Sequence, residues 1–256
     1  MPAPALQTVW NRLHGATVDF VYPPACVLCG QDLPLDSSGP SKSLCVACQT
    51  DLAPPPLQDC GQCGAPVGPF AATTGGCPYC RDDNFSFETV CRLNVYEGRL
   101  REACLLAKSA GGEPMARTLA ELVWERCGTR LLQLGCQQVI AIPPHWTRRF
   151  TQPHSAPETI ARTLAARLDI PVCARTLVKI RRTPRQAGAS PTVRRQQQRG
   201  VFRCRRPSRI AGQTILLVDD ILTTGSTVQA AAKALKSAGA GRIVVAAIAR
   251  GLGRHA

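Results

Sequence analysis

Residues 215–227 read ILLVDDILTTGST, and this stretch decides the fold. Its first four residues, from Ile215 to Val218, are aliphatic, and a short run of this kind is typical of a strand buried on both faces of a parallel sheet. Two acids, Asp219 and Asp220, follow directly. A turn of small residues comes next and leads into an alanine-rich stretch that begins near Val228 and has a helical pattern. The order is therefore a strand, a loop and the N-terminus of a helix.

The loop in this stretch has the chemistry of a phosphate site. Gly225 lets the backbone approach a ligand closely, and free N–H groups at a helix start favour an anion. Hydroxyls come from Thr223, Thr224, Ser226 and Thr227. Two adjacent carboxylates would repel a phosphate, so we expect at least one to face sugar hydroxyls or a metal. A phosphorylated sugar satisfies both halves, whereas the alternative is a turn whose Asp and Thr residues only cap the helix.

Eight of the 14 cysteines form CxxC pairs, a pattern that indicates metal binding in a cytosolic protein. The count fits two tetrahedral zinc sites with four thiolates each. The paired residues are Cys26, Cys29, Cys45, Cys48, Cys60, Cys63, Cys77 and Cys80. The simplest arrangement joins neighbouring pairs, but an interleaved arrangement, disulfides and a single zinc site remain open. Because few aliphatic residues lie between Pro23 and Asp83, we expect metal to supply the folding energy of this segment.

The remainder of the chain alternates between strand and helix patterns. Strands are expected at 89–96, 139–142, 171–178 and 242–249, and helices at 100–108, 115–127, 156–168 and 228–238. This alternation predicts an α/β fold with a doubly wound parallel sheet, in which ligands bind at the carboxyl ends of the strands. The predicted domains are an N-terminal helix at 1–20, a cysteine-rich segment at 21–84 and the α/β domain at 85–256.

The net charge of +14 comes from the middle of the chain, where residues 144–210 carry 16 Lys or Arg against two acids. Such a run can be a solvated face, a lid that binds pyrophosphate or a nucleic-acid track. Since residues 175–200 contain no aromatic side chain, support for DNA contact is electrostatic only. No apolar run is long enough to span a bilayer and no signal peptide is recognisable, so we expect a cytoplasmic location.

The chain from about Phe20 to Arg250 resembles the competence protein ComF and GntX-like family. The loop itself is similar to the phosphoribosyl pyrophosphate (PRPP) signature of type I phosphoribosyltransferases. Besides this loop and the CxxC pairs, the resemblance is carried by Tyr96-Glu97-Gly98 leading to Lys108, Ile142-Pro143-Pro144-His145-Trp146 with Arg148-Arg149, Thr183 and Gln186 ahead of Ser190, and Arg199-Gly200-Val201-Phe202.

This resemblance implies a double zinc ribbon, with two structural zinc ions, ahead of a type I phosphoribosyltransferase-like domain. Asp219 and Asp220 would hold the ribose hydroxyls, and residues 223–227 would hold the 5′-phosphate. Arg148 and Arg149 would neutralise the pyrophosphate that leaves with Mg²⁺. Lys108 would assist them, and residues 181–200 would form a lid.

The family name implies a role in DNA uptake, with single-stranded DNA and a helicase-type competence protein as partners. The chain departs from the family pattern at 152–156, where members commonly have Arg-Gly-Phe-Asn-Gln, and also at Ala189 and Gln197. Two functions therefore stay open. One is a PRPP-binding phosphoribosyltransferase, and the other is a non-catalytic, zinc-dependent module that binds single-stranded DNA or a helicase.

Overall fold

The structure is a computed structural model that describes residues 23–34, 43–55, 58–70, 75–144, 154–181 and 200–252. The predicted N-terminal helix at 1–20, Arg148 and Arg149, and residues 182–199 of the predicted lid lie outside these ranges. In chain order the elements are α2 (Val46–Leu52), β1 (Thr89–Val95), α3 (Gly98–Ala107), α4 (Glu113–Gln133), β2 (Gln138–Ala141), α5 (Ala156–Leu168), β3 (Leu177–Lys179), β4 (Phe202–Cys204), η2 (Pro207–Arg209), β5 (Thr214–Leu222), α7 (Ser226–Ser237) and β6 (Arg242–Arg250).

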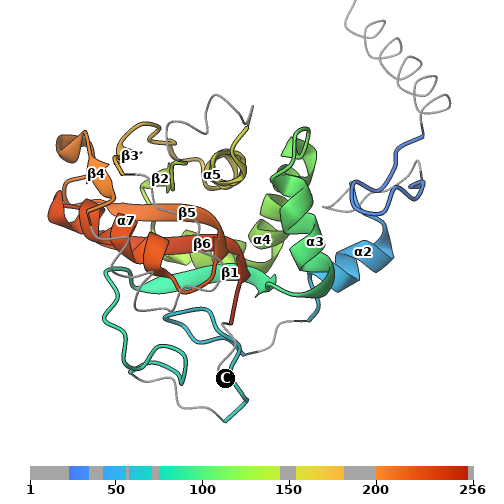
Figure 1. Ribbon diagram of the computed structural model, residues 1–256, viewed down its shortest axis with the longest axis horizontal. Helices are drawn as coiled ribbons and strands as arrows, with labels where there is room; N and C mark the ends of the chain where they lie inside the picture. Colours follow the sequence, from blue (N-terminus) through green and yellow to red (C-terminus); the bar gives the residue numbers. More distant parts are fainter. Residues whose placement is uncertain are drawn as a thin grey trace, which may run out of the picture.

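Four parallel strands form the central sheet, in the order β1-β6-β5-β2. Side chains along β5 alternate between two hydrophobic cores: Leu216 and Val218 pack with α3, α4 and α5, whereas Ile215 and Leu217 pack with α7, β3 and β4. Helices thus cover both faces of the sheet (Figure 1). The predicted α/β fold with a parallel sheet is confirmed.

The strand expected at 171–178 is divided in two. Val172 makes an isolated parallel bridge to Val139, and β3 then pairs with β4 in a separate antiparallel sheet. The division occurs at Arg175, whose φ of 63° places it in the left-handed region that an extended strand cannot contain. The apolar pattern at 171–178 predicted extended structure on both sides of Arg175, but it did not indicate the turn between them.

Helix α4 is longer than the predicted 115–127. It continues through Gly128, which is buried, and ends near Gly135, which has a φ of 61°. A Cβ at Gly128 would lie 3.0 Å from the ring of Trp124, so the glycine makes room for this ring rather than ending the helix. Gly135 is the residue that terminates it, since glycine adopts positive φ without strain.

The cysteine-rich segment packs against the α/β domain at two separate places. Its first half, with α2, contributes Leu33, Leu44 and Leu52 to the core that includes α3 and α4. Its second half lies along β1, the edge strand of the sheet (Figure 1). Within the described part of the chain, no helix is both long and apolar enough to cross a membrane.

Candidate functional site

The two predicted acids lie near the carboxyl end of β5, which continues past them to Leu222. Asp219 is buried, with 8% of its surface exposed, and its Oδ1 accepts a hydrogen bond of 2.9 Å from the backbone N–H of Asp220. Asp220 is half-buried, and its Oδ2 lies 2.9 Å from Nζ of Lys108, directly after α3. The structure therefore brings together three of the predicted site residues from two distant parts of the chain.

The burial of Asp219 has an electrostatic consequence. Loss of solvent raises the pKa of its carboxyl from 3.8 to about 7, and the negative charge of Asp220 adds to this effect. The backbone N–H of Asp220 and the positive charges of Lys108 and Lys179 oppose it. Asp219 is thus able to gain or lose a proton near neutral pH, while the more exposed Asp220 is paired with a cation.

The predicted phosphate loop leads into α7 as the sequence indicates. Gly225 is the N-cap residue of α7 and has a φ of 72°, which favours glycine. Gly225 has no side chain that could cap the helix. Thr224 Oγ1 accepts a long hydrogen bond of 3.4 Å from the N–H of Ser226 and donates to Ser226 Oγ at 2.9 Å. The first N–H of α7 is therefore partly satisfied by Thr224, and an anion would bind to the other N–H groups of the first turn.

Arg250, at the end of β6, is a site residue that the sequence analysis missed. Its buried Nη1 donates to the backbone carbonyls of Leu222, Thr223 and Gly251. These bonds hold the start of the loop against the end of β6. The sequence did contain one signal for this role, because a charged residue, Arg250, follows directly after the apolar run of β6. A buried guanidinium needs several acceptors, and three adjacent carbonyls supply them.

The loop is also fastened to the segment that follows the cysteines. Gln229 of α7 accepts from the N–H of Ser86 at 2.7 Å and donates to the carbonyl of Asn84 at 3.0 Å. Phe85 lies between these two residues, with a ring atom 4.0 Å from the position of a Cβ at Gly225. The first turn of α7 is therefore held in place by residues 84–86.

A cavity of about 390 Å³ opens at the carboxyl end of β2. Its polar lining includes His154, Glu158 and Arg162 from the start of α5, together with Arg175. His154 Nε2 lies 2.8 Å from the carbonyl oxygen of Ala107, so one lining residue of the cavity contacts the residue that precedes Lys108. The sequence had indicated this region through Pro143 and Pro144, which belong to the resembled motif, and through the departure from the family pattern at 152–156. The cavity is large enough for a small molecule.

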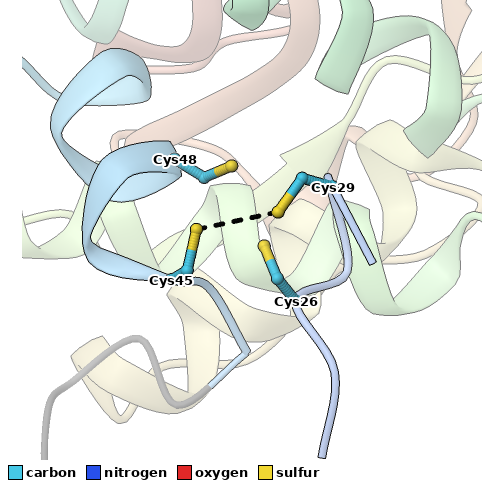
Figure 2. A group of neighbouring side chains, drawn as sticks. All are labelled: Cys26, Cys29, Cys45 and Cys48. Atoms are coloured by element: carbon cyan, nitrogen blue, oxygen red, sulfur yellow. Dashed lines mark hydrogen bonds between the residues drawn. The ribbon is translucent and has the colours of Figure 1, made fainter. Parts of the chain in front are cut away.

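The first four paired cysteines form one cluster, in which all sulfur atoms lie within 4.8 Å of one another. Figure 2 shows the four side chains converging, with Cys29 and Cys45 on opposite sides and their sulfurs 3.7 Å apart. Cys26 and Cys48 are buried, and Cys29 is exposed. Cys45 precedes α2, so this short helix helps to orient two of the four thiols.

The last four paired cysteines form a second cluster, and all of them are buried. The sulfurs of Cys63 and Cys77 lie 3.5 Å apart, and those of Cys60 and Cys80 lie 3.8 Å apart. These separations far exceed a disulfide bond of about 2.05 Å. They match the edge of about 3.8 Å that a tetrahedron acquires when Zn–S bonds are about 2.3 Å long. The grouping follows neighbouring pairs, not the interleaved alternative, and the two clusters suggest two zinc sites.

Contacts with β1 hold the second cluster in place. Arg92 Nε donates to the carbonyl of Gly64, and its guanidinium forms an ion pair with Asp59. Thr89 Oγ1 donates to the carbonyl of Gly61 in the same way. Gly64 has a φ of 70°, and a Cβ there would lie 2.9 Å from Val90. Side chains of the edge strand β1 therefore hold the second cluster against the sheet.

Comparison with protein families gives two matches. Residues 17–82 match the double zinc ribbon domain, and residues 155–255 match the phosphoribosyl transferase domain. Together they confirm the predicted combination of a zinc-ribbon segment with a phosphoribosyltransferase domain. The exact boundaries at residues 20 and 84 stay a prediction.

Similar proteins have names connected with DNA. The chain is 27% identical over 229 residues to Competence protein F of Haemophilus influenzae. The aligned residues make up 88% of this chain and 96% of that protein. It is 26% identical over 240 residues to DNA utilization protein YhgH of Salmonella typhimurium, covering 91% and 100% of the two chains. Among solved structures, glutamine PRPP amidotransferase of B. subtilis, complexed with ADP and GMP, matches 53% of this chain and 27% of its own, at 22% identity and a TM-score of 0.35.

Proposed function

Because a double zinc ribbon and a phosphoribosyl transferase domain occur together in this chain, we propose that it binds PRPP or a related phosphosugar in a pathway of DNA uptake or utilisation. The observation that carries the proposal is the position of Asp219 and Asp220. They lie directly ahead of a loop that leads into a helix without a side-chain cap. Acceptors for sugar hydroxyls and donors for a phosphate therefore follow one another along the chain.

Each part of the site has a distinct task in this proposal. The carboxylates accept hydrogen bonds from the ribose 2′ and 3′ hydroxyls, while residues 223–227 donate N–H and O–H groups to the 5′-phosphate. Lys108 orients Asp220 through their ion pair. Arg250 holds the loop carbonyls away from the phosphate oxygens, which they would repel. Mg²⁺, which accompanies PRPP, would supply positive charge at the pyrophosphate.

Chemistry at the ribose would require that pyrophosphate leave with its charge neutralised. We assign this task to Arg148 and Arg149 from the sequence resemblance. The cavity beside His154, at the carboxyl end of β2, provides room for an acceptor molecule. In a transfer reaction, the acceptor forms a bond to ribose C1 as the bond from C1 to the pyrophosphate oxygen breaks.

Calorimetry with PRPP and Mg²⁺ tests the binding site. The Asp219→Asn, Asp220→Asn variant should lose about 10²- to 10⁴-fold in affinity, since hydrogen bonds to charged groups contribute about 1.5–3 kcal/mol each and two of them lose their charge. The matched control is Asp51→Asn with Asp82→Asn, which removes two exposed carboxylates outside the site. Unchanged affinity in the first variant defeats the assignment.

A non-catalytic binding module is the second candidate, and one observation favours it. Where members of the resembled family have Arg-Gly-Phe-Asn-Gln, residues 152–156 of this chain are Gln-Pro-His-Ser-Ala. The side chain of His154 in this stretch bonds to a backbone carbonyl. Measurement of pyrophosphate release decides between the two. Binding of PRPP without any pyrophosphate release, in the presence of purines, pyrimidines and single-stranded DNA as acceptors, would support the module.

Zinc in both cysteine clusters completes the proposal. The donor set is four thiolates in each cluster, and their spacing fits a tetrahedral ion. Zinc would supply folding energy to a segment that has little apolar core of its own. Metal analysis of freshly reduced protein should return about two zinc ions per chain, and a value near zero contradicts the assignment.

A further inference from the structure

The excess of positive charge found at residues 144–210 is matched by the overlapping stretch from residue 170 onward. Residues 170–256 contain 17 Lys or Arg, and their only acids are Asp219 and Asp220. The first of these is buried and the second is paired with Lys108, so both belong to the site described above. The surface built by residues 170–252 in the described ranges therefore has almost no negative charge to offset its cations.

These cations lie mainly on one side of the molecule. Helix α7 contacts β4, and both pack with β3 on the same face of the central sheet (Figure 1). The exposed cations of these elements and the turns beside them form what we call the basic face: Arg175, Arg181, Arg203, Arg205, Arg206, Arg209, Lys233 and Lys236. Among the described residues, no acid forms an ion pair with any of them.

The opposite face of the sheet differs in this respect. Its helices α4 and α5 carry charges of both signs, and these neutralise one another locally. Arg117 pairs with Glu113 at 3.4 Å, and Arg167 pairs with Glu121 at 2.8 Å. Cations without acidic partners are therefore characteristic of the basic face and not of the α4 and α5 side. Like charges held close together without counter-charges repel one another, and an external polyanion removes this repulsion.

The shape and composition of the basic face indicate which polyanion fits. Binding at a membrane surface requires a buried apolar face in addition to cations. Among described residues of 170–252, Ile180 is the one large hydrophobic side chain with substantial exposure. The cations of the basic face are instead distributed over β4, η2, α7 and the turns on either side of β3. A chain of repeated phosphates can contact such an extended set.

The described part of the basic face has no exposed aromatic side chain on which a nucleic-acid base could stack. Phe202 is the only aromatic residue in 170–256, and it is buried, with Lys179 Nζ 5.9 Å above its ring. Proteins that prefer single strands stack bases on exposed aromatic rings. We propose that the basic face binds the phosphate backbone of nucleic acid without stacking, and therefore binds duplex at least as well as single strands. This inference rests on the proposed link to DNA and replaces the single-strand preference expected from the sequence.

The salt dependence of binding has a predictable size. If six of the eight cations contact phosphates, the logarithm of the affinity should fall with the logarithm of salt concentration with a slope of about −5. Affinity for duplex should then drop by about 10³-fold between 50 and 200 mM salt. Loss of two of these contacts should reduce the magnitude of the slope by about 2.

Fluorescence anisotropy with a labelled 30-base-pair duplex and the matching single strand tests the proposal. The variant Arg203→Gln with Arg206→Gln removes two charges from the basic face. The control Arg101→Gln with Arg117→Gln removes two exposed charges from α3 and α4, so the net charge of the two proteins is the same. We expect a shallower salt slope and at least tenfold weaker duplex binding for the first variant only.

Four outcomes would overturn the inference: equal losses in both variants, a single-strand preference above tenfold, no binding at 50 mM salt, or equally strong binding to phosphatidylserine vesicles that depends on Arg203 and Arg206. Calorimetry with PRPP on the same variants keeps the two proposals apart. The basic-face variant should retain the wild-type PRPP affinity, whereas the Asp219 and Asp220 variant should retain its DNA affinity. A failure of one proposal therefore leaves the other measurable.

Discussion

Replacement of Asp219 by Asn should stabilise the protein, and increasingly so as the pH rises. The pKa of this carboxyl is raised to about 7 by burial, against 3.8 for an unperturbed Asp. The folded state therefore binds the proton more tightly than the unfolded state. The contribution of Asp219 to stability is fully present below pH 3.8 and is lost as the pH rises through about 7. Asn keeps the shape and the hydrogen-bond acceptor but does not ionise.

The expected magnitude follows from the size of the shift. At pH 5 the unfolded chain has released the proton and the folded chain has kept it, which lowers the wild-type free energy of unfolding by about 1.6 kcal/mol. At pH 8 both states are ionised, and the difference reaches its limit of ~4 kcal/mol, since one pKa unit corresponds to about 1.36 kcal/mol. Because Asn does not ionise, the free energy of unfolding of Asp219→Asn should not be lowered by this titration at either pH.

Urea denaturation at several pH values, with zinc present throughout, measures this difference. The stability gain of Asp219→Asn over the wild type should grow between pH 4 and 7 and then level off. In Asp220→Asn, where the second cause of the shift is removed, the levelling should occur at lower pH because the pKa of Asp219 falls. A gain that is the same at pH 4 and pH 8 would refute the reasoning, because it would show that the carboxyl does not titrate between these values.

Three further predictions concern the zinc segment and the loop. Cys63→Ser should lower the zinc content from about two to about one ion per chain, because it removes one of four thiolates from the second cluster; inductively coupled plasma analysis measures this. Arg92→Met should cost about 3–5 kcal/mol in urea denaturation, because it leaves Asp59 half-buried without its cation, and a change below 1 kcal/mol would contradict that role. Arg250→Met should weaken PRPP binding in calorimetry by about tenfold, since three carbonyls that include that of Thr223 lose their donor, whereas wild-type affinity would contradict that role for Arg250.

Much of the fold was predictable because its signals are local. The run Ile215 to Val218 is buried on both faces, and each of its side chains enters one of two cores, as a central parallel strand requires. The CxxC spacing likewise limits which sulfurs can meet at one ion. Both features depend on residues close together in sequence, and both appear in the structure where they were expected.

The parts that the sequence did not reveal depend on contacts between distant segments. Nothing near Arg250 in sequence indicates that Leu222 and Thr223 would need its guanidinium. The turn at Arg175 adopts a conformation that most residues avoid, so neither propensity nor hydrophobic pattern could locate it. The predicted helix stopped at residue 127, but α4 continues through Gly128, whose lack of a side chain leaves room for Trp124. In each case tertiary packing prevailed over the local pattern.

The zinc segment and the phosphate loop form one continuous structure, not two modules joined by a linker. Phe85 packs against the second cysteine cluster and against the core that contains α7, and its neighbours Asn84 and Ser86 bind Gln229 in the first turn of that helix. The geometry of the first turn of α7 therefore depends on where residues 84–86 are held. Since the cluster is fixed to β1 through Arg92, the cysteine-rich segment contributes to the shape of the proposed phosphate loop.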